Sequence, residues 1–346
     1  MCWCRYIPKL FLLAILAIAF VVNLTLIYPL FIMRVNNLSF LSIDYKDLES
    51  KGYVVIPSFL SSEEIEILRN DSSEQDSQGL PKNQNYRLGA ISKVALAKFT
   101  EKFNEVSAGV RAQTNIQADL LVGGAYFSTD GNQSFGWHQD HESYYLTQNH
   151  YDYLNLYMPI IKPDISKSNL CIIPFDRLKS RSPKIYKNLL NRGATHYQIE
   201  KNKTIVHNDN EGGTFGILDY SIEDIAETPH LNSGDLLLIR GDVIHRTQDA
   251  ETLRTALSIR ITSSQDKIVK DNLIRGGLKK FHMMLNNAAE YQVVFDYLDH
   301  HKIKQFSVSG KDTEKFIEFS KTFSNKKWMT RSQFFRYLIW QKIKTG

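Results

Sequence analysis

The sequence has 346 residues, a formal net charge of +5, and hydrophobic and aromatic shares of 43% and 12%. This composition is typical of a folded protein of one large or two ordinary domains and excludes a disordered chain. Because the positive charge is not gathered into a basic run in the middle of the chain, nucleic acid is not expected as a partner. The three cysteines do not form a disulfide framework, which favours a reducing compartment.

The N-terminal segment predicts a membrane anchor. Residues 10–33 carry no charge and are long enough to cross a bilayer as a helix, which needs about 20 apolar residues. A cleaved secretory signal is the alternative, because Ala17 and Ala19 resemble a cleavage site, but a cut there would leave a strongly apolar new terminus. We therefore expect residues 1–35 to form an uncleaved single-pass anchor. Basic residues flank both ends, so its orientation is left open.

The residues after the anchor predict a helix, a strand and a helix, followed by a series of short strands. Gly52 ends the first helix, and YVVIP follows as a strand of β-branched residues. Further apolar runs, separated by turns, are 118–127, 153–160, 169–175, 214–218, 234–242 and 254–261. This pattern is typical of a mainly β protein with flanking helices, built on a double-stranded β-helix of the jelly-roll or cupin-like kind. We assign residues 36–265 to this domain.

The C-terminal residues 266–346 predict a helical extension packed on the core. They end in KKWMTRSQFFRYLIWQKIKTG, which is basic and aromatic. A closing helix that packs on the β domain is the favoured interpretation. The alternative is a helix that lies on a membrane surface beside the anchor.

An H-x-D triplet supplies two metal ligands, because alternate residues of an extended segment point the same way. Two histidines and one carboxylate on one side of a metal are the ligand set of non-haem iron oxygenases. The triplet occurs three times, as His138-Gln-Asp140, His150-Tyr-Asp152 and His207-Asn-Asp209. We favour the first, which follows a predicted strand and is flanked by aromatic residues. The second immediately precedes a strand, where its residues would be exposed to solvent, and the third lies in a predicted turn.

The third ligand is expected from a distant strand. His245 follows the apolar run 234–240 and its turn, and Arg254 begins the strand RTALSIRI nine residues later (254 − 245). On that strand Arg254 shares a face with Ala256, Ser258 and Arg260, and this arrangement leaves room for a guanidinium to bind a carboxylate. The alternative is that Arg254 pairs with a surface Asp or Glu.

Several segments, taken in order, resemble the phytanoyl-CoA dioxygenase family of iron(II)- and 2-oxoglutarate-dependent oxygenases. They are GYVVIPSFLSSEEIEILR, WHQDHESYY, YLNLYMPIIKPD, CIIPF, GDVIHR and LRTALSIR, within residues 45–261. The chain departs from the family pattern after CIIP, where a Gly-Ser-His turn is usual and Phe175, Asp176 and Arg177 stand instead. The segment between the distal histidine and the arginine is also shorter than the family's.

The resemblance implies ligands for Fe(2+), namely His138, Asp140 and His245. It also implies residues that bind the cosubstrate 2-oxoglutarate, namely Arg254, Thr247, Asn155 and Tyr126. With O2 as the second cosubstrate, the implied activity is a dioxygenase that converts 2-oxoglutarate to succinate and carbon dioxide while it hydroxylates a substrate. The presence of Asp140 favours hydroxylation over halogenation, because a halogenase of this fold has a small residue at that position.

The expected substrate is a small molecule or a lipid, including one held in the membrane, and its identity is not predicted. The need for 2-oxoglutarate and reduced iron favours a domain that faces the cytosol. Two alternatives stay open at this point: a zinc hydrolase that uses the same triad, and a membrane-tethered binding module without catalysis. His141 and Glu142 are either groups that orient the site or solvated loop residues. The oligomeric state is not predicted.

Overall fold

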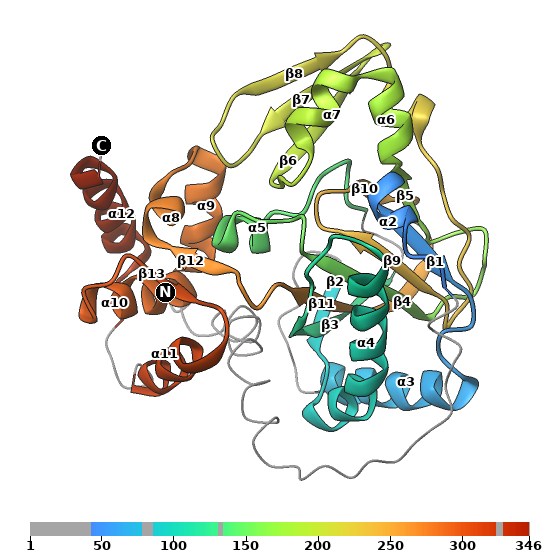
Figure 1. Ribbon diagram of the computed structural model, residues 1–346, viewed down its shortest axis with the longest axis horizontal. Helices are drawn as coiled ribbons and strands as arrows, with labels where there is room; N and C mark the ends of the chain where they lie inside the picture. The colour runs from blue at the N-terminus through green and yellow to red at the C-terminus, as the bar shows by residue number, and fades with distance from the viewer. Residues whose placement is uncertain (1–42, 78–85, 131–133, 323–327, 346) are drawn as a thin grey trace.

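The structure is a computed structural model that describes residues 43–77, 86–130, 134–322 and 328–345. Its largest element is a six-stranded antiparallel sheet (Figure 1). The strands, in spatial order, are β1 (Tyr53–Ile56), β9 (Leu236–Arg240), β4 (Leu154–Ile161), β11 (Leu253–Thr262), β3 (Leu120–Asp130) and β2 (Tyr86–Ala90). Strands that are distant in the sequence are neighbours in this sheet, so residues 53–262 form one unit.

The two faces of this sheet have different partners. Helices α2 (Asp47–Ser50), α3 (Ser62–Ser77) and α4 (Lys93–Gln113) cover the outer face. Leu156 of β4 and Leu257 of β11 belong to the apolar cluster with these helices. Tyr157 and Ala256, the next residues in alternation, pack on the inner face instead. The alternation of a strand therefore assigns the polar residues of 254–260 to the interior, as predicted.

A smaller sheet lies against the inner face. It contains β5 (Leu170–Ile173) and β10 (Ile244–Thr247), which pair in antiparallel register. A three-stranded meander continues on its far side, made of β6 (Thr195–Glu200), β7 (Lys203–Asn208) and β8 (Thr214–Leu218). Short helices pack nearby, namely α5 (Glu142–Thr147), α6 (Phe175–Arg181), α7 (Pro183–Leu189) and the 3-10 helix η2 (Ile222–Ile225). Ile172 of β5 and Leu237 of β9 share one cluster, so apolar side chains join the two sheets.

The C-terminal region has a core of its own. It comprises β12 (Lys267–Val269), α8 (Lys270–Ile274), α9 (Leu278–Asn286), α10 (Ala288–His300), β13 (Gln305–Ser307), α11 (Gly310–Thr322) and α12 (Arg331–Thr345). These elements lie together on one side of the sheets (Figure 1). Leu146 of α5 joins their apolar cluster, which includes Phe295 and Phe334. The described chain is thus mainly antiparallel sheet with flanking helices, which confirms that part of the prediction.

The predicted membrane anchor lies outside the described residues, which begin at residue 43. Within the part of the chain that the structure describes, no helix combines the length and the apolar character that crossing a bilayer would take.

Candidate metal centre

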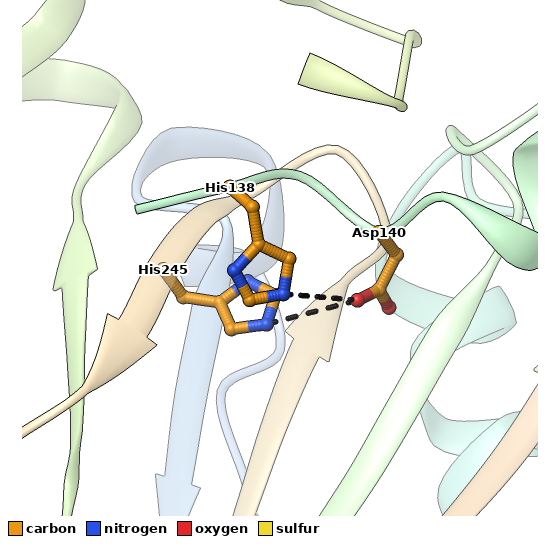
Figure 2. A group of neighbouring side chains, drawn as sticks. All are labelled: His138, Asp140 and His245. Atoms are coloured by element: carbon orange, nitrogen blue, oxygen red, sulfur yellow. Dashed lines mark ion pairs between the residues drawn. The ribbon is translucent and has the colours of Figure 1, made fainter. Parts of the chain in front are cut away.

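Three side chains converge where the inner faces of the two sheets meet. Asp140 Oδ1 lies 3.9 Å from His138 Nε2 and 3.7 Å from His245 Nε2 (Figure 2). One potential ligand atom from each residue falls within 4.8 Å of the others. The three side chains are between 11% and 22% exposed. Sequence analysis selected these three residues, and the fold brings them together.

Backbone pairing fixes the two histidines relative to each other. His138 N donates to His245 O over 3.0 Å, and His245 N donates to His138 O over 2.9 Å. Residues that exchange both bonds lie directly opposite each other, with their side chains on the same face. The two imidazole rings are accordingly 4.4 Å apart, centroid to centroid.

Gln139, between the two ligands of the triplet, points the other way and is fully buried. Its amide nitrogen donates to Asp242 O over 2.7 Å and to Leu189 O over 3.2 Å, and its carbonyl oxygen accepts from Thr195 Oγ1 over 2.7 Å. Every one of these partners belongs to a different segment. Gln139 therefore fastens the triplet to the surrounding structure while His138 and Asp140 face the site.

Each imidazole presents the same nitrogen to the site. His138 Nδ1 lies 2.7 Å from Gly136 O, and His245 Nδ1 lies 3.0 Å from Val243 O. A carbonyl oxygen accepts, so each Nδ1 carries the proton and each Nε2 keeps its lone pair. Metal-binding histidines in proteins are usually held in this way by a hydrogen bond from the other ring nitrogen.

The protonation states suit a cation. Burial, together with the neighbouring His245, lowers the pKa of His138 to about 3. Burial alone would raise the pKa of Asp140, but its neighbours His245, Arg260 and His138 lower it to about 2. At neutral pH the site therefore offers a neutral imidazole and a carboxylate, the forms that bind a metal. Two nitrogens and one oxygen on one side match a first-row divalent ion such as iron(II).

A buried cation with an unused donor lies on the same inner face. Arg254 is 6% exposed, and among the described residues its Nη1 has no hydrogen-bond partner. The hydroxyl of Tyr157 on β4 is also buried without a partner. Burial raises the pKa of this phenol, and the nearby Arg254 counteracts the shift. Buried donors are normally satisfied, so these two residues fit an anionic group that binds between the sheets. The alternative prediction, in which Arg254 pairs with a surface carboxylate, is therefore wrong.

Asn155 and Arg260 form a hydrogen-bonded chain beside Asp140. Asn155 Oδ1 accepts from Ser258 Oγ over 2.7 Å, and Arg260 Nη1 donates to the same hydroxyl. Asn155 is 6% exposed on β4 and faces the interior, since it lies two residues from Tyr157 on the same strand. It lies opposite Arg260 on β11, close to the Asp140 side of the site.

Of two further residues expected to bind the cosubstrate, Tyr126 lies elsewhere, and Thr247 lies on the face of His245 with its hydroxyl already hydrogen-bonded. Tyr126 belongs to the outer apolar cluster and donates to Asp71 Oδ2 over 2.7 Å, so its placement in the pocket is wrong. The cause is the register of β3, which pairs Tyr126 with Leu257 on the outer face. The Thr247 hydroxyl accepts from Phe135 N over 2.8 Å and lies 3.3 Å from Phe135 O. It holds the segment that leads to His138.

The structure gives the other two H-x-D triplets other partners. His150 is fully buried, with Nδ1 3.0 Å from Gly241 O and Nε2 2.9 Å from Ser143 Oγ, while Asp152 accepts from Gln117 N. His150 was expected at a solvated strand entry, and its burial corrects that expectation. His207 stacks on His196, and Asp209 belongs to a separate polar cluster. Among the described residues, 138, 140 and 245 form the one group that could hold a metal.

Asp209 is the centre of a polar cluster beside the triad. His141 Nε2 lies 2.7 Å from Asp209 Oδ2, and His196 Nδ1 lies 2.7 Å from Oδ1. Lys279 Nζ, from α9 of the C-terminal region, lies 2.5 Å from Oδ2. Burial alone would raise the pKa of Asp209, but these hydrogen bonds hold it well below its usual range. The His141 side chain is 15% exposed and bonded to Asp209, so it is not a solvated loop residue.

Four histidines form a row across the smaller sheet. Neighbouring strands pair His207 with His196, His196 with His138, and His138 with His245. Directly opposite residues share a face, so the row joins the triad to the Asp209 cluster. Sequence analysis missed His196 and Lys279, and no local pattern identifies either. It also missed Tyr157 and Arg260, although the alternation of 153–160 and 254–261 places both on the inner face.

No protein-family model and no curated protein matches this chain. Among solved structures it resembles the epimerase SnoN from nogalamycin biosynthesis, in complex with Fe3+ and alpha ketoglutarate, at 10% identity, with 66% of this chain and 85% of that chain covered and a TM-score of 0.46. A prolyl-4-hydroxylase of Pseudomonas putida is 10% identical, with 64% of this chain and 98% of that chain covered and a TM-score of 0.44. HygX of Streptomyces hygroscopicus, with nickel and 2-oxoglutarate bound, is 13% identical, with 64% of this chain and 86% of that chain covered and a TM-score of 0.39.

Proposed function

We propose that the chain is an iron(II)- and 2-oxoglutarate-dependent oxygenase. The buried Nη1 of Arg254 carries this proposal, because it has no hydrogen-bond partner among the described residues and lies on the inner face that also lines the triad. A metal site alone would equally suit a hydrolase. A buried cation without a counter-ion is costly unless an anion binds there, and 2-oxoglutarate has a second carboxylate that reaches beyond the metal. Arg254 gives that carboxylate a partner.

In this proposal His138, Asp140 and His245 hold the iron, which with O2 and 2-oxoglutarate supplies the oxidising power when bound. The chain's own residues position the reactants. Arg254 and the Tyr157 hydroxyl donate to the distal carboxylate, and a bidentate contact fixes its direction. Apolar side chains between the sheets, which include Leu237 and Ala256, are fully buried or nearly so and keep water away from it.

We further propose a jelly-roll domain over residues 36–265 that is related to the phytanoyl-CoA dioxygenases and hydroxylates a small-molecule or lipid substrate. The antiparallel sheets, the order of the site residues along the chain and Asp140 in the ligand set support this proposal. The helical region 266–346 is proposed as an extension of that domain. The uncharged segment 10–33 supports attachment to a membrane by a single span. The need for 2-oxoglutarate and reduced iron supports a domain on the cytosolic side.

Anaerobic titration of the full chain tests the proposal. Iron(II) is added first and 2-oxoglutarate second, and the visible charge-transfer band of the chelated keto acid is recorded. Arg254→Ala is expected to weaken 2-oxoglutarate binding by at least about 30-fold with iron affinity retained, because it removes a buried charge pair. His138→Ala is expected to lose iron and band together.

Two variants serve as matched controls. His150→Ala removes a histidine of a rejected triplet and should keep the band. Arg260→Gln removes the other inner-face arginine and should keep 2-oxoglutarate affinity within a few fold of the original. A folded, metal-loaded protein without a band would contradict the oxygenase and support the zinc hydrolase or the binding module. Loss of the band in Arg260→Gln with retention in Arg254→Ala would contradict the assignment of Arg254.

A further inference from the structure

Helix α12 is apolar on two opposite faces. Phe334 and Leu338 are fully buried in the C-terminal core. Other large apolar side chains of the same helix are exposed, namely Phe335 (43%), Ile339 (37%), Trp340 (53%) and Ile343 (75%). We call these four residues the outer face of α12. A helix that is apolar all round is normally covered on all sides.

The outer face is continuous along the helix. Phe335, Ile339 and Ile343 are spaced by four residues, so they lie in one row, and Trp340 follows beside them. The helix lies at the edge of the molecule (Figure 1). Leu278, the first residue of α9, is 85% exposed. It lies two residues from Gly276, whose carbonyl accepts from Lys342 Nζ over 2.9 Å, so this exposed side chain is close to the last turn of α12.

The charge of this segment identifies the kind of surface that would cover it. From Lys321 to the C-terminus the sequence contains seven lysines and arginines and no aspartate or glutamate. Arg336 and Lys342 are exposed on α12 itself. A second copy of the chain would place these cations against one another. A surface of anionic lipid headgroups would instead neutralise them and accept the apolar side chains below the phosphates.

We propose that the outer face of α12 docks on an anionic membrane surface. Phe335, Ile339, Trp340 and Ile343 enter the boundary between headgroups and acyl chains, while Arg336 reaches the phosphates with an extended side chain. This contact is independent of the metal site and of the segment 10–33, which would hold the chain at a bilayer without determining which face meets it.

A measurement local to Trp340 tests the docking in the full chain. The protein is reconstituted in phosphatidylcholine vesicles with and without phosphatidylserine, with brominated acyl chains as the quencher of tryptophan fluorescence. The signal of Trp340 is the difference between the original chain and Trp340→Phe. We expect quenching of this signal when phosphatidylserine is present, and weaker quenching at high salt because the headgroup attraction is screened. Arg336→Gln should lower the docking equilibrium about fivefold.

The double variant Ile339→Ser with Ile343→Ser should abolish the quenching of Trp340. Ile217→Ser is its matched control, since Ile217 is 61% exposed on β8 and distant in the fold from α12. Unchanged thermal unfolding of each variant shows that the fold is intact. The proposal is overturned if Trp340 is not quenched, or if quenching is equal without phosphatidylserine. It is also overturned if the double variant instead dissociates a dimer in sedimentation, which would make a second copy the occupant.

Discussion

His138 and His245 are 107 residues apart (245 − 138), yet their main chains exchange hydrogen bonds of 3.0 Å and 2.9 Å. This bridge holds both imidazoles on one face, and the carbonyls of Gly136 and Val243 orient the rings. The relative position of the two histidine ligands is thus set by strand pairing. A preformed site of this kind loses little conformational freedom when the ion binds.

Tyr157 and Tyr126 provide a matched pair for the cosubstrate site. Tyr157→Phe is expected to weaken 2-oxoglutarate binding about 10- to 100-fold, because it removes a donor to a charged carboxylate. Tyr126→Phe should leave that affinity unchanged and lower the free energy of unfolding by about 1 kcal/mol, since it removes the bond to Asp71. Titration of the visible band and urea denaturation measure the two effects. Equal loss of affinity in both variants would contradict the placement of Tyr157.

Gln139 is expected to support both stability and metal binding. Gln139→Leu keeps the volume but removes one hydrogen bond each from Asp242 O, Leu189 O and the Thr195 hydroxyl, which should cost about 2 to 3 kcal/mol. Cobalt(II) affinity should fall as well, because the segment between two ligands loses its anchor. Gln198→Leu, at an exposed position of β6, should stay within about 0.5 kcal/mol. An unchanged cobalt affinity in Gln139→Leu would disprove the anchoring role.

His150 predicts a pH dependence of stability. Burial lowers its pKa to about 4 in the folded state, against about 6.5 in an unfolded chain. The unfolded state therefore binds more protons between these values, so the stabilising contribution is complete above pH 6.5 and is lost as the pH falls towards 4. The loss is about 3 kcal/mol, at 1.36 kcal/mol per unit.

Urea denaturation at pH 7, 6, 5 and 4 measures this slope. His150→Gln does not titrate in the range, so its unfolding free energy should fall less steeply than that of the original chain. Parallel slopes for the two proteins would show that His150 is not the responsible group.

The turn before His245 contains a buried ion pair. Arg240 Nη2 lies 2.6 Å from Asp242 Oδ2, with the two side chains 2% and 0% exposed. Asp242→Ala leaves the guanidinium buried and uncompensated, which should cost about 3 to 5 kcal/mol. The comparison is Asp47→Ala, where the pair with Lys51 is 49% and 40% exposed and should contribute below about 1 kcal/mol. Thermal unfolding of both variants measures the stability that each one loses. Similar losses would contradict the larger contribution of the buried pair.

The sequence was sufficient for the parts of the site that depend on alternation. His138 and Asp140 are two residues apart on an extended segment, and Arg254 lies on the inner face of a strand with small neighbours. Tyr126 could not be placed in this way, because 118–127 has no regular alternation of polar and apolar residues to show which face is inner. The register of β3 against β11 determines that face.

The Asp209 cluster depends on tertiary packing that no local pattern encodes. Lys279 comes from the C-terminal helices and His196 from the meander, and Asp209 lies in a turn whose residues are typical of turns in general. Similarly, the Gly-Ser-His turn of the resembled family is replaced here by the start of α6, at Phe175. These differences lie in the elements around the site, and they leave His138, Asp140 and His245 together.

The histidine row has a consequence for how the protein acquires its metal. His138 pairs with His196 and His245 across 58 and 107 residues (196 − 138 and 245 − 138), and such pairings form slowly, because a long loop must close first. An ion that needs both His138 and His245 therefore binds the folded chain and not the unfolded one, so it raises the free energy of unfolding in proportion to the logarithm of its concentration. Metal supply would then control how much folded protein persists as well as how much is active.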